Sequence, residues 1–212
     1  MLKKNIVVLI SGNGSNLQAF IDRSNSESLQ GEVVAVISNK ANAYGLQRAA
    51  KKNIPAITIE HEQFESRDVF DTTLMLEIDK YSPDLVILAG FMRILAASFV
   101  THYRGRLLNI HPSLLPKYPG LHTHRRALEF RDEHHGASVH YVTEELDGGP
   151  VIAQSKIQIE NNDTELSLQK KVQKLEHTLY PATANLLLTD KIRIIKDIVY
   201  FENEPLKEKL YF

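Results

Sequence analysis

The 212-residue chain contains no cysteine, which excludes several kinds of chemistry at once. Disulfide bonds, thiolate nucleophiles and cysteine-ligated zinc or iron–sulfur sites all require that residue. An excess of charge of one sign is also lacking, because 25 lysine and arginine residues against 26 aspartate and glutamate residues leave a formal net charge of −1. This balance gives no reason to expect a nucleic-acid surface or a polybasic membrane patch.

Long apolar runs are missing as well. The first apolar run, from Ile6 to Ile10, is too short for the core of a signal peptide or for a membrane span. With 43% hydrophobic and 24% charged residues, the composition is that of a soluble globular protein. The length fits one domain without a flexible linker or internal repeat. We therefore expect a cytoplasmic protein with no membrane contact and no nucleic-acid partner.

Short apolar segments bounded by turn residues recur along the first half of the chain, at residues 5–11, 33–38, 54–59, 85–89 and 107–110. Segments at residues 16–22, 43–52 and 66–81 are long enough to be crossover helices. Strands that alternate with helices predict a doubly wound, Rossmann-like α/β fold with a mostly parallel sheet and helices on both faces. The strands are continuously apolar, which agrees with burial on both sides.

The second half of the chain has a different pattern. Residues 136–143 and 151–159 alternate more visibly and predict antiparallel strands, and residues 165–188 predict a long helix. A strand or hairpin is expected at residues 192–201, followed by a peripheral tail.

The most informative segment is NIHPSLLP, at residues 109–116. On an extended segment Asn109 and His111 project to the same face, because strand side chains alternate with period two. An amide that can hydrogen-bond a developing oxyanion and an imidazole that can move a proton suit acyl transfer. The alternative is a buried strand followed by a purely structural proline turn.

A second motif, SGNGSN at residues 11–16, follows the first strand and opens the first helix. Small residues allow close backbone approach, and a helix N-terminus favours an anion, so the motif predicts a phosphate site. The spacing is not the G-x-G-x-x-G fingerprint, which disfavours an NAD-dependent enzyme. The alternative is a tight turn with a serine or asparagine as helix cap.

Two further segments could complete a site. Asp147 precedes Gly148-Gly149-Pro150, and near His111 it would stabilise the imidazolium and raise its pKa, or order a water. Alone, such a sequence is usually only a turn. Residues 91–95, FMRIL, follow the fourth strand. Open α/β sheets bind ligands at the carboxyl ends of their strands, so this segment could line a slot for a flat heterocycle. The alternative is a loop whose apolar side chains pack among themselves.

The histidines do not form a convincing metal motif. His122, His124, His134 and His135 lie in polar, loop-like stretches, and no H-E-x-x-H occurs. We expect no metal site. His140 and His177 are expected to be structural or to lie at the rim of the site.

Taken together, NIHPSLLP, SGNGSN and EELDGGP (residues 144–150) resemble the folate-dependent formyltransferases, in a likeness that runs from Ile6 to Glu176 and His177. The combination is similar to the branch that formylates glycinamide ribonucleotide in purine biosynthesis. The resemblance implies the formyltransferase fold, with 10-formyltetrahydrofolate as co-substrate and 5-phosphoribosylglycinamide as acceptor. It implies no tightly bound cofactor, small-molecule partners, and a monomer or weak homodimer.

The resemblance also implies a role for individual residues. The catalytic residues are Asn109, His111 and Asp147. The phosphoribosylglycinamide-binding residues are Gly14, Ser15, Asn16, Gln173, Lys174, Leu175 and Glu176. The folate-binding residues are Arg67, Met92, Arg93, Ile94, Leu95, Asn109, Thr143, Glu144, Glu145, Leu146 and Asp147. We expect a single domain over 1–212, with a phosphate-binding half at 1–110, a folate-binding and catalytic half at 111–200, and a tail at 201–212.

The expected mechanism is direct attack of the amine on the formyl carbon, without a covalent enzyme intermediate. Asn109 and the imidazolium of His111 hydrogen-bond the oxyanion, and protons pass through His111, Asp147 or a water. One alternative is a formyltetrahydrofolate deformylase, in which water replaces the amine, although that type usually carries an added N-terminal domain. The other is a non-catalytic module that binds a phosphate ligand, which would not need the proton-transfer pair. A methionyl-tRNA formyltransferase would normally add a basic RNA-binding domain.

Overall fold

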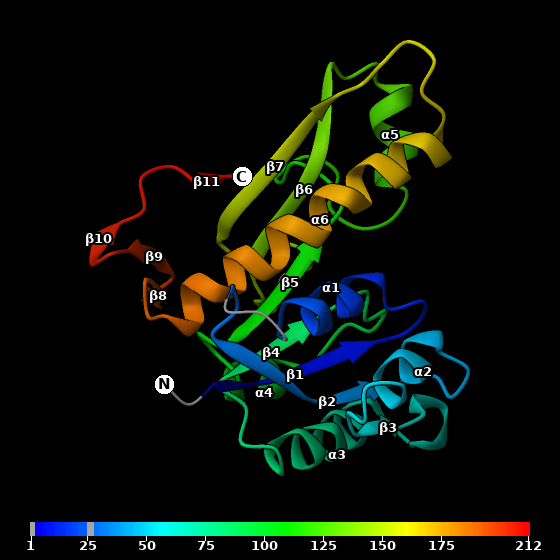
Figure 1. The fold of residues 1–212 in the computed structure, drawn as a ribbon, viewed down its shortest axis with the longest axis vertical. Helices are drawn as coiled ribbons and strands as arrows, with labels where there is room; N and C mark the ends of the chain where they lie inside the picture. Colours follow the sequence, from blue (N-terminus) through cyan, green and yellow to red (C-terminus); the bar gives the residue numbers. More distant parts are fainter. Residues whose placement is uncertain (1–2, 25–27) are drawn as a thin grey trace.

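The computed structural model describes residues 3–24 and 28–212. Eight strands form one sheet in the order β11-β7-β6-β5-β4-β1-β2-β3, and β10-β9-β8 form a small second sheet (Figure 1). The strands are β1 (Lys4–Ile10), β2 (Gly31–Ser38), β3 (Ala56–Thr58), β4 (Leu85–Leu88), β5 (Leu107–His111), β6 (His134–Tyr141), β7 (Val151–Gln158), β8 (Ile192–Ile195), β9 (Ile198–Phe201), β10 (Glu204–Pro205) and β11 (Leu210–Tyr211). The helices are α1 (Ser15–Ser24), α2 (Tyr44–Ala50), the 3₁₀ helix η1 (His61–Gln63), α3 (Arg67–Asp79), α4 (Ala97–His102), α5 (Thr123–Glu129) and α6 (Glu165–Leu188).

The parallel part of the sheet confirms the predicted α/β fold. Strand β1 pairs in parallel with β2 and β4, and β4 pairs in parallel with β5. The side chains of β1 divide between two cores: Ile6 and Val8 pack with α1 and α6, whereas Val7 and Leu9 pack with α3 and α4. Helices therefore cover both faces, which is why Ile6–Ile10 of β1 and all of β4 are continuously apolar.

The second half adds antiparallel strands, as the alternating pattern predicts. β5 pairs with β6, and β6 with β7, both antiparallel. The long helix α6 crosses this part of the sheet (Figure 1), and Thr164 caps its first turn by accepting a hydrogen bond from the Ser167 amide. The buried Tyr180 hydroxyl contacts the carbonyls of Leu88 in β4 and Leu108 in β5, at 3.1 and 2.8 Å, which fixes α6 over the centre of the sheet.

Three features differ from the sequence prediction. Helices α4 and α5 are only 6 and 7 residues long, too short to show a helical period among polar residues. The tail is not wholly peripheral, because Leu210 and Tyr211 pair with β7 and form an edge of the main sheet. A strand of two residues is too short to show an alternating pattern, so this pairing could not be predicted from the sequence. Within the described ranges no helix is both long and apolar enough to cross a bilayer.

Candidate active site

Asn109 and His111 project from the end of β5 to the same side, as their spacing predicts, and both meet Asp147. The Asn109 Nδ2 atom lies 3.4 Å from Asp147 Oδ1, and the His111 Nδ1 atom lies 3.3 Å from Asp147 Oδ2. The structure thus joins the three residues expected to be catalytic, and it places the aspartate in direct contact with the histidine. The side chains of His111 and Asp147 are almost entirely buried, with 6% and 7% exposed.

The Asp147 carboxylate is held by backbone geometry. Its residue adopts a left-handed conformation with φ of 52°, and the Gly120 amide donates to Oδ2 at 2.9 Å. A Cβ on Gly149 would stand 1.8 Å from the Tyr141 carbonyl oxygen, so only glycine lets the loop lie against β6. Burial opposes ionisation, but the neighbouring His140 ring, the hydrogen bond from the Gly120 amide and the nearby His111 ring together lower the pKa of Asp147 below its usual value. The group is a carboxylate at neutral pH.

The His111 ring has one nitrogen committed to the backbone. Its Nε2 lies 2.8 Å from the Tyr118 carbonyl oxygen, which can only accept, so Nε2 carries a hydrogen. In the neutral ring Nδ1 is then unprotonated and faces Asp147. Asp147 raises the pKa of His111 as expected, and so does the Tyr118 carbonyl. Burial outweighs both, however, and lowers the pKa of His111 from its usual value. His111 is therefore a neutral base whose free nitrogen gains a carboxylate partner when it is protonated.

Asn109 is oriented by a residue that the sequence analysis placed only at the rim, His140. The His140 Nδ1 atom lies 2.8 Å from the Tyr141 carbonyl and must donate to it, so in the neutral ring Nε2 accepts. Asn109 Nδ2 meets that Nε2 at 3.1 Å, which fixes which end of the amide carries the hydrogens. The second amide hydrogen of Asn109 makes only the long 3.4 Å contact with Asp147, so Asn109 can donate a hydrogen bond through it to a substrate oxygen.

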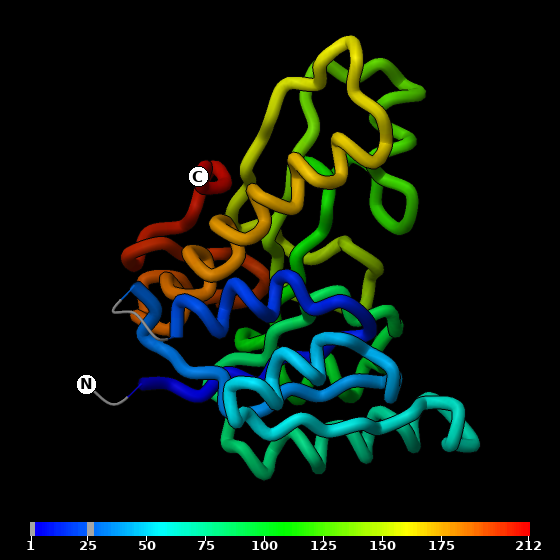
Figure 2. Tube along the Cα trace, turned by 45° about the vertical axis from the view of Figure 1, so that its right-hand side comes forward, coloured from blue at the N-terminus to red at the C-terminus, as the bar shows by residue number. Residues whose placement is uncertain are grey.

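The predicted phosphate loop and the predicted ribonucleotide segment of α6 lie against each other. Gln173 donates to the Ser15 hydroxyl at 2.8 Å, which leaves the hydroxyl hydrogen available to an incoming acceptor. Asn16 donates to Glu176 at 2.8 Å (Figure 2 shows α1 beneath α6). Burial raises the pKa of Glu176, and the Asn16 bond partly offsets this.

Gly14 has a packing role that the sequence analysis did not foresee. Its φ is 73°, and a Cβ there would lie 2.8 Å from the Cα of Gly45 in α2. The loop is held from the same side by Arg48, which donates to the backbone and side-chain oxygens of Asn13, each at 2.9 Å. These contacts fix the loop at the start of α1 before any ligand binds.

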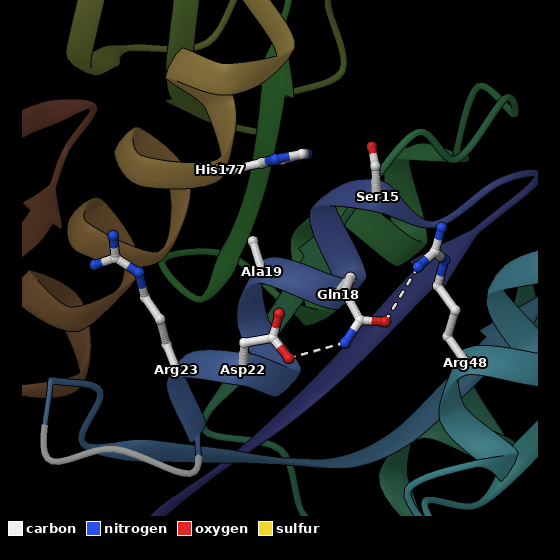
Figure 3. A pocket seen from close by; sticks show the side chains of 7 residues that line it. All are labelled: Ser15, Gln18, Ala19, Asp22, Arg23, Arg48 and His177. Carbon is white, nitrogen blue, oxygen red and sulfur yellow. Dashed lines mark hydrogen bonds between the residues drawn. The ribbon is translucent and has the colours of Figure 1, made fainter.

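A cavity of about 360 Å³ opens beside this loop (Figure 3). Arg48 bonds Gln18, and Gln18 bonds Asp22, along the exposed side of α1. The cavity is lined by Ser15, Gln18, Ala19, Asp22, Arg23, Arg48 and His177. Of the residues expected to bind ligand, only Ser15 is among them, so this cavity borders the predicted phosphate site and is separate from the Asp147 cluster.

The segment expected to bind the pterin follows β4 and is tied to the residue after β1 and to α3. The Met92 amide donates to Ser11 Oγ at 2.8 Å, and the Ala96 amide donates to Asp71 at 2.6 Å. Met92 and Ile94 are largely exposed, at 65% and 58%, as a free binding surface requires, whereas Leu95 is buried in the core.

The remaining residues of the expected folate group lie mostly at the surface. Arg93 is partly buried with its guanidinium 6.0 Å from the Phe70 ring, and Arg67 is exposed at the start of α3. In the loop after β6, Thr143 is partly buried and Glu144, Glu145 and Leu146 are exposed. In α6, Lys174 is exposed and Leu175 partly buried.

The histidines that resembled a metal motif form one pair. His124 Nδ1 and His135 Nε2 lie 3.0 Å apart, and burial lowers the pKa of both rings. Across residues 3–24 and 28–212, no three histidine, aspartate or glutamate side chains group so as to hold a metal ion.

The chain is similar to known proteins over most of its length. The family model described as formyl transferase matches residues 4–184. Phosphoribosylglycinamide formyltransferase of Escherichia coli (strain K12) is 53% identical over 207 residues, covering 98% of each chain. The trifunctional purine biosynthetic protein adenosine-3 of Drosophila melanogaster is 46% identical over 92% of this chain, which spans 15% of that protein. The solved structure of phosphoribosylglycinamide formyltransferase from Coxiella burnetii has a TM-score of 0.95 and 49% identity, covering 99% of each chain.

Proposed function

Because the chain belongs to the formyl transferase family, we propose that it transfers a formyl group from 10-formyltetrahydrofolate to the amine of 5-phosphoribosylglycinamide. The products are formylglycinamide ribonucleotide and tetrahydrofolate, in purine biosynthesis. The observation that carries the proposal is the cluster that Asn109 and His111 of β5 form with Asp147 of the loop after β6. A neutral base, a carboxylate beside it and an amide donor are the groups that acyl transfer to an amine requires.

The ribonucleotide is assigned to the first loop and α6. Its phosphate would accept hydrogen bonds from the backbone at Gly14, Ser15 and Asn16, where the start of α1 favours an anion. Glu176, which accepts a hydrogen bond from Asn16, would also accept hydrogen bonds from the ribose hydroxyls when the ribonucleotide binds. The exposed Met92 and Ile94 are assigned to the pterin ring of the folate. The tail of the folate would extend toward Arg67.

The chemistry follows from the protonation states. The substrate amine attacks the formyl carbon, and the amide hydrogen of Asn109 stabilises the oxyanion of the tetrahedral intermediate. The proton lost by the attacking nitrogen reaches Nδ1 of His111 through Asp147 or through a water. The resulting imidazolium is stabilised by Asp147. The same proton passes to the folate nitrogen as its bond to the formyl carbon breaks, so charge and atoms balance. An oxyanion donor of this kind contributes about 3 kcal/mol, roughly two orders of magnitude in rate.

His111 differs here from its expected role as an oxyanion donor. Nε2 is bonded to the Tyr118 carbonyl and Nδ1 faces Asp147, so neither nitrogen is aimed at open space. We therefore assign proton transfer to His111 and the direct hydrogen bond to Asn109.

The test is steady-state formyl transfer from 10-formyltetrahydrofolate, with and without the ribonucleotide. Tetrahydrofolate that forms only when the ribonucleotide is present supports the transferase. Equal release without it would identify a deformylase, and no product in either case would leave a phosphate-ligand binding module. Thermal unfolding provides an independent check, because the ribonucleotide and a folate analogue should each raise the melting temperature and NAD should not.

The setting proposed for the enzyme is the cytoplasm, as a monomer or weak homodimer with small molecules as its partners. All residues of the catalytic cluster come from one chain, so a second copy is not needed to complete that cluster. Sedimentation equilibrium over a range of concentrations measures the oligomeric state directly.

A further inference from the structure

The loop after β5 contacts the catalytic pair from both sides through its backbone. The Tyr118 carbonyl accepts from His111 Nε2 at 2.8 Å, and the Gly120 amide donates to Asp147 Oδ2 at 2.9 Å. These two contacts come from residues only two positions apart. The Tyr118–Gly120 segment therefore sets the position of the imidazole and of the carboxylate together, and a displacement of the segment would disturb both.

The segment is itself fixed by α5 and the turn that follows that helix. The Tyr118 hydroxyl donates to Asp132 Oδ2 at 2.8 Å, and the Tyr118 ring stacks on Phe130 with centroids 6.0 Å apart. Arg126 lies over the same ring at 4.9 Å and donates to the Pro119 carbonyl at 2.7 Å. Tyr118 has φ of 57°, a left-handed conformation that a tyrosine adopts only where its surroundings hold it.

Asp132 is the acidic group that accepts from the Tyr118 hydroxyl. Its side chain is only 14% exposed, and its other oxygen accepts from Lys117 at 2.8 Å. The hydrogen bonds from Lys117 and Tyr118 outweigh the effect of burial and lower the pKa of Asp132, so it is ionised at neutral pH. A carboxylate is a strong acceptor for the tyrosine hydroxyl.

We propose that Asp132 and Tyr118 are positioning residues for formyl transfer: Asp132 fixes the Tyr118 hydroxyl, and the fixed segment presents its carbonyl to His111 and its amide to Asp147. Neither side chain touches the reacting atoms in this scheme. The kinetic consequence rests on the proposed function, whereas the effect on the His111 ring does not.

Loosening the segment has a definite electrostatic consequence. The Tyr118 carbonyl raises the pKa of His111, and the Gly120 amide lowers the pKa of Asp147. The other charged or titratable groups that act on His111 are Asp147, His140 of β6 and Arg126 of α5, and His111 is also coupled to His124 of α5 and His135 of β6. A Tyr118→Phe variant leaves these groups in place and removes only the hydroxyl, so a change in His111 titration would report the position of the segment.

The experiment compares Tyr118→Phe and Asp132→Ala with the control Lys117→Met, which removes the lysine contact of Asp132 and keeps the tyrosine contact. We expect the first two variants to lose roughly tenfold to a hundredfold in kcat, with KM nearly unchanged, as for a displaced catalytic group. In both, NMR titration of the His111 ring should give a lower pKa than in the wild type. Lys117→Met should match the wild type in both measurements. Asp132→Asn, which keeps an acceptor for the hydroxyl, should recover most of the loss.

A Tyr118→Phe variant with wild-type kcat and wild-type His111 titration would overturn the inference. Reduced kcat with unchanged titration would also overturn it, because the loss would then arise elsewhere. If Asp132→Ala does not fold, Tyr118→Phe decides alone, since its ring can still stack on Phe130. If the wild type transfers no formyl group, the proposed function fails, and the titrations still test the positioning.

Discussion

Replacing Asp147 by asparagine tests the proton-transfer scheme most directly. The backbone of residue 147 is left-handed, and asparagine tolerates that conformation better than most residues. The new amide oxygen can accept from Gly120 as the carboxylate does. We therefore expect the variant to fold, with a change in unfolding free energy of no more than about 2 kcal/mol. The charge beside His111 is lost while the shape of the site is kept.

The size of the effect follows from the separation of the charges. A carboxylate 3.3 Å from an imidazolium attracts it by about 5 kcal/mol at an effective dielectric constant of about 20. This figure is a ceiling, because the asparagine dipole retains part of the interaction. An expected loss of about 3–4 kcal/mol in the transition state corresponds to a fall in kcat of roughly a hundredfold to a thousandfold. The KM values should change little, since the charge pair forms only during turnover.

The pH dependence of the variant has a predicted sign. His111 must be neutral to accept a proton, so kcat/KM should fall as the pH drops through its pKa, which burial lowers from the usual value of a histidine. Asp147 raises that pKa, and its replacement removes the contribution. In Asp147→Asn the acid limb should therefore move to lower pH while the plateau falls. A limb that moves to higher pH would contradict this assignment.

A matched control is available at Asp190, another left-handed aspartate, whose exposed side chain pairs with Lys4 at 3.1 Å. An exposed pair of this kind contributes about 0–1 kcal/mol, so Asp190→Asn should keep wild-type kcat. The assay is steady-state formyl transfer for both variants, with thermal unfolding to check that each is folded. Turnover of Asp147→Asn within about threefold of the wild type would refute the reasoning, because the loss expected from the charge is far larger.

Three further substitutions test other parts of the site. Asn109→Ala removes the oxyanion donor and should lower kcat by roughly two orders of magnitude with the fold intact; a loss below about fivefold would assign the oxyanion to another group. Gly149→Ala forces a Cβ to within 1.8 Å of the Tyr141 carbonyl oxygen, so the Asp147 loop must shift. The melting temperature and kcat should both fall. An unchanged kcat would show that the loop can relax without moving the Asp147 carboxylate. Glu176→Gln keeps an oxygen that can accept the hydrogen bond from Asn16 and removes the charge. The KM for the ribonucleotide should therefore rise by roughly tenfold, while the KM for the folate stays constant. A change in the folate KM alone would show that the site between α1 and α6 binds the folate and not the ribonucleotide.

The sequence predicts the fold well where burial leaves a pattern. The inner segments of the parallel strands are continuously apolar because helices cover both faces, and α6 has the predicted bounds because Thr164 caps it and its apolar positions repeat. The shared face of Asn109 and His111 follows from strand geometry alone. The short helices α4 and α5 and the edge strand β11 leave no such pattern.

The supports of the catalytic residues could not be predicted, for a different reason. Tyr118 and Gly120 act through a backbone carbonyl and a backbone amide, and every residue has a carbonyl. His140 meets Asn109 because β5 and β6 pair with these two residues directly opposite each other. The register of β5 and β6 depends on residues 112–133 between them. The sequence alone therefore does not reveal that His140 lies opposite Asn109.

Burial and hydrogen bonding act in opposite directions on the His111–Asp147 pair, and the proposed chemistry needs both. Burial alone would make His111 a base too weak to hold the proton of an amine, and a fully solvated pair would lose the attraction that stabilises the imidazolium. The backbone contacts from Tyr118 and Gly120 favour the charged forms without adding a mobile charge. A neutral ring at rest, with a carboxylate beside its free nitrogen, can therefore accept the proton during attack and release it to the leaving nitrogen.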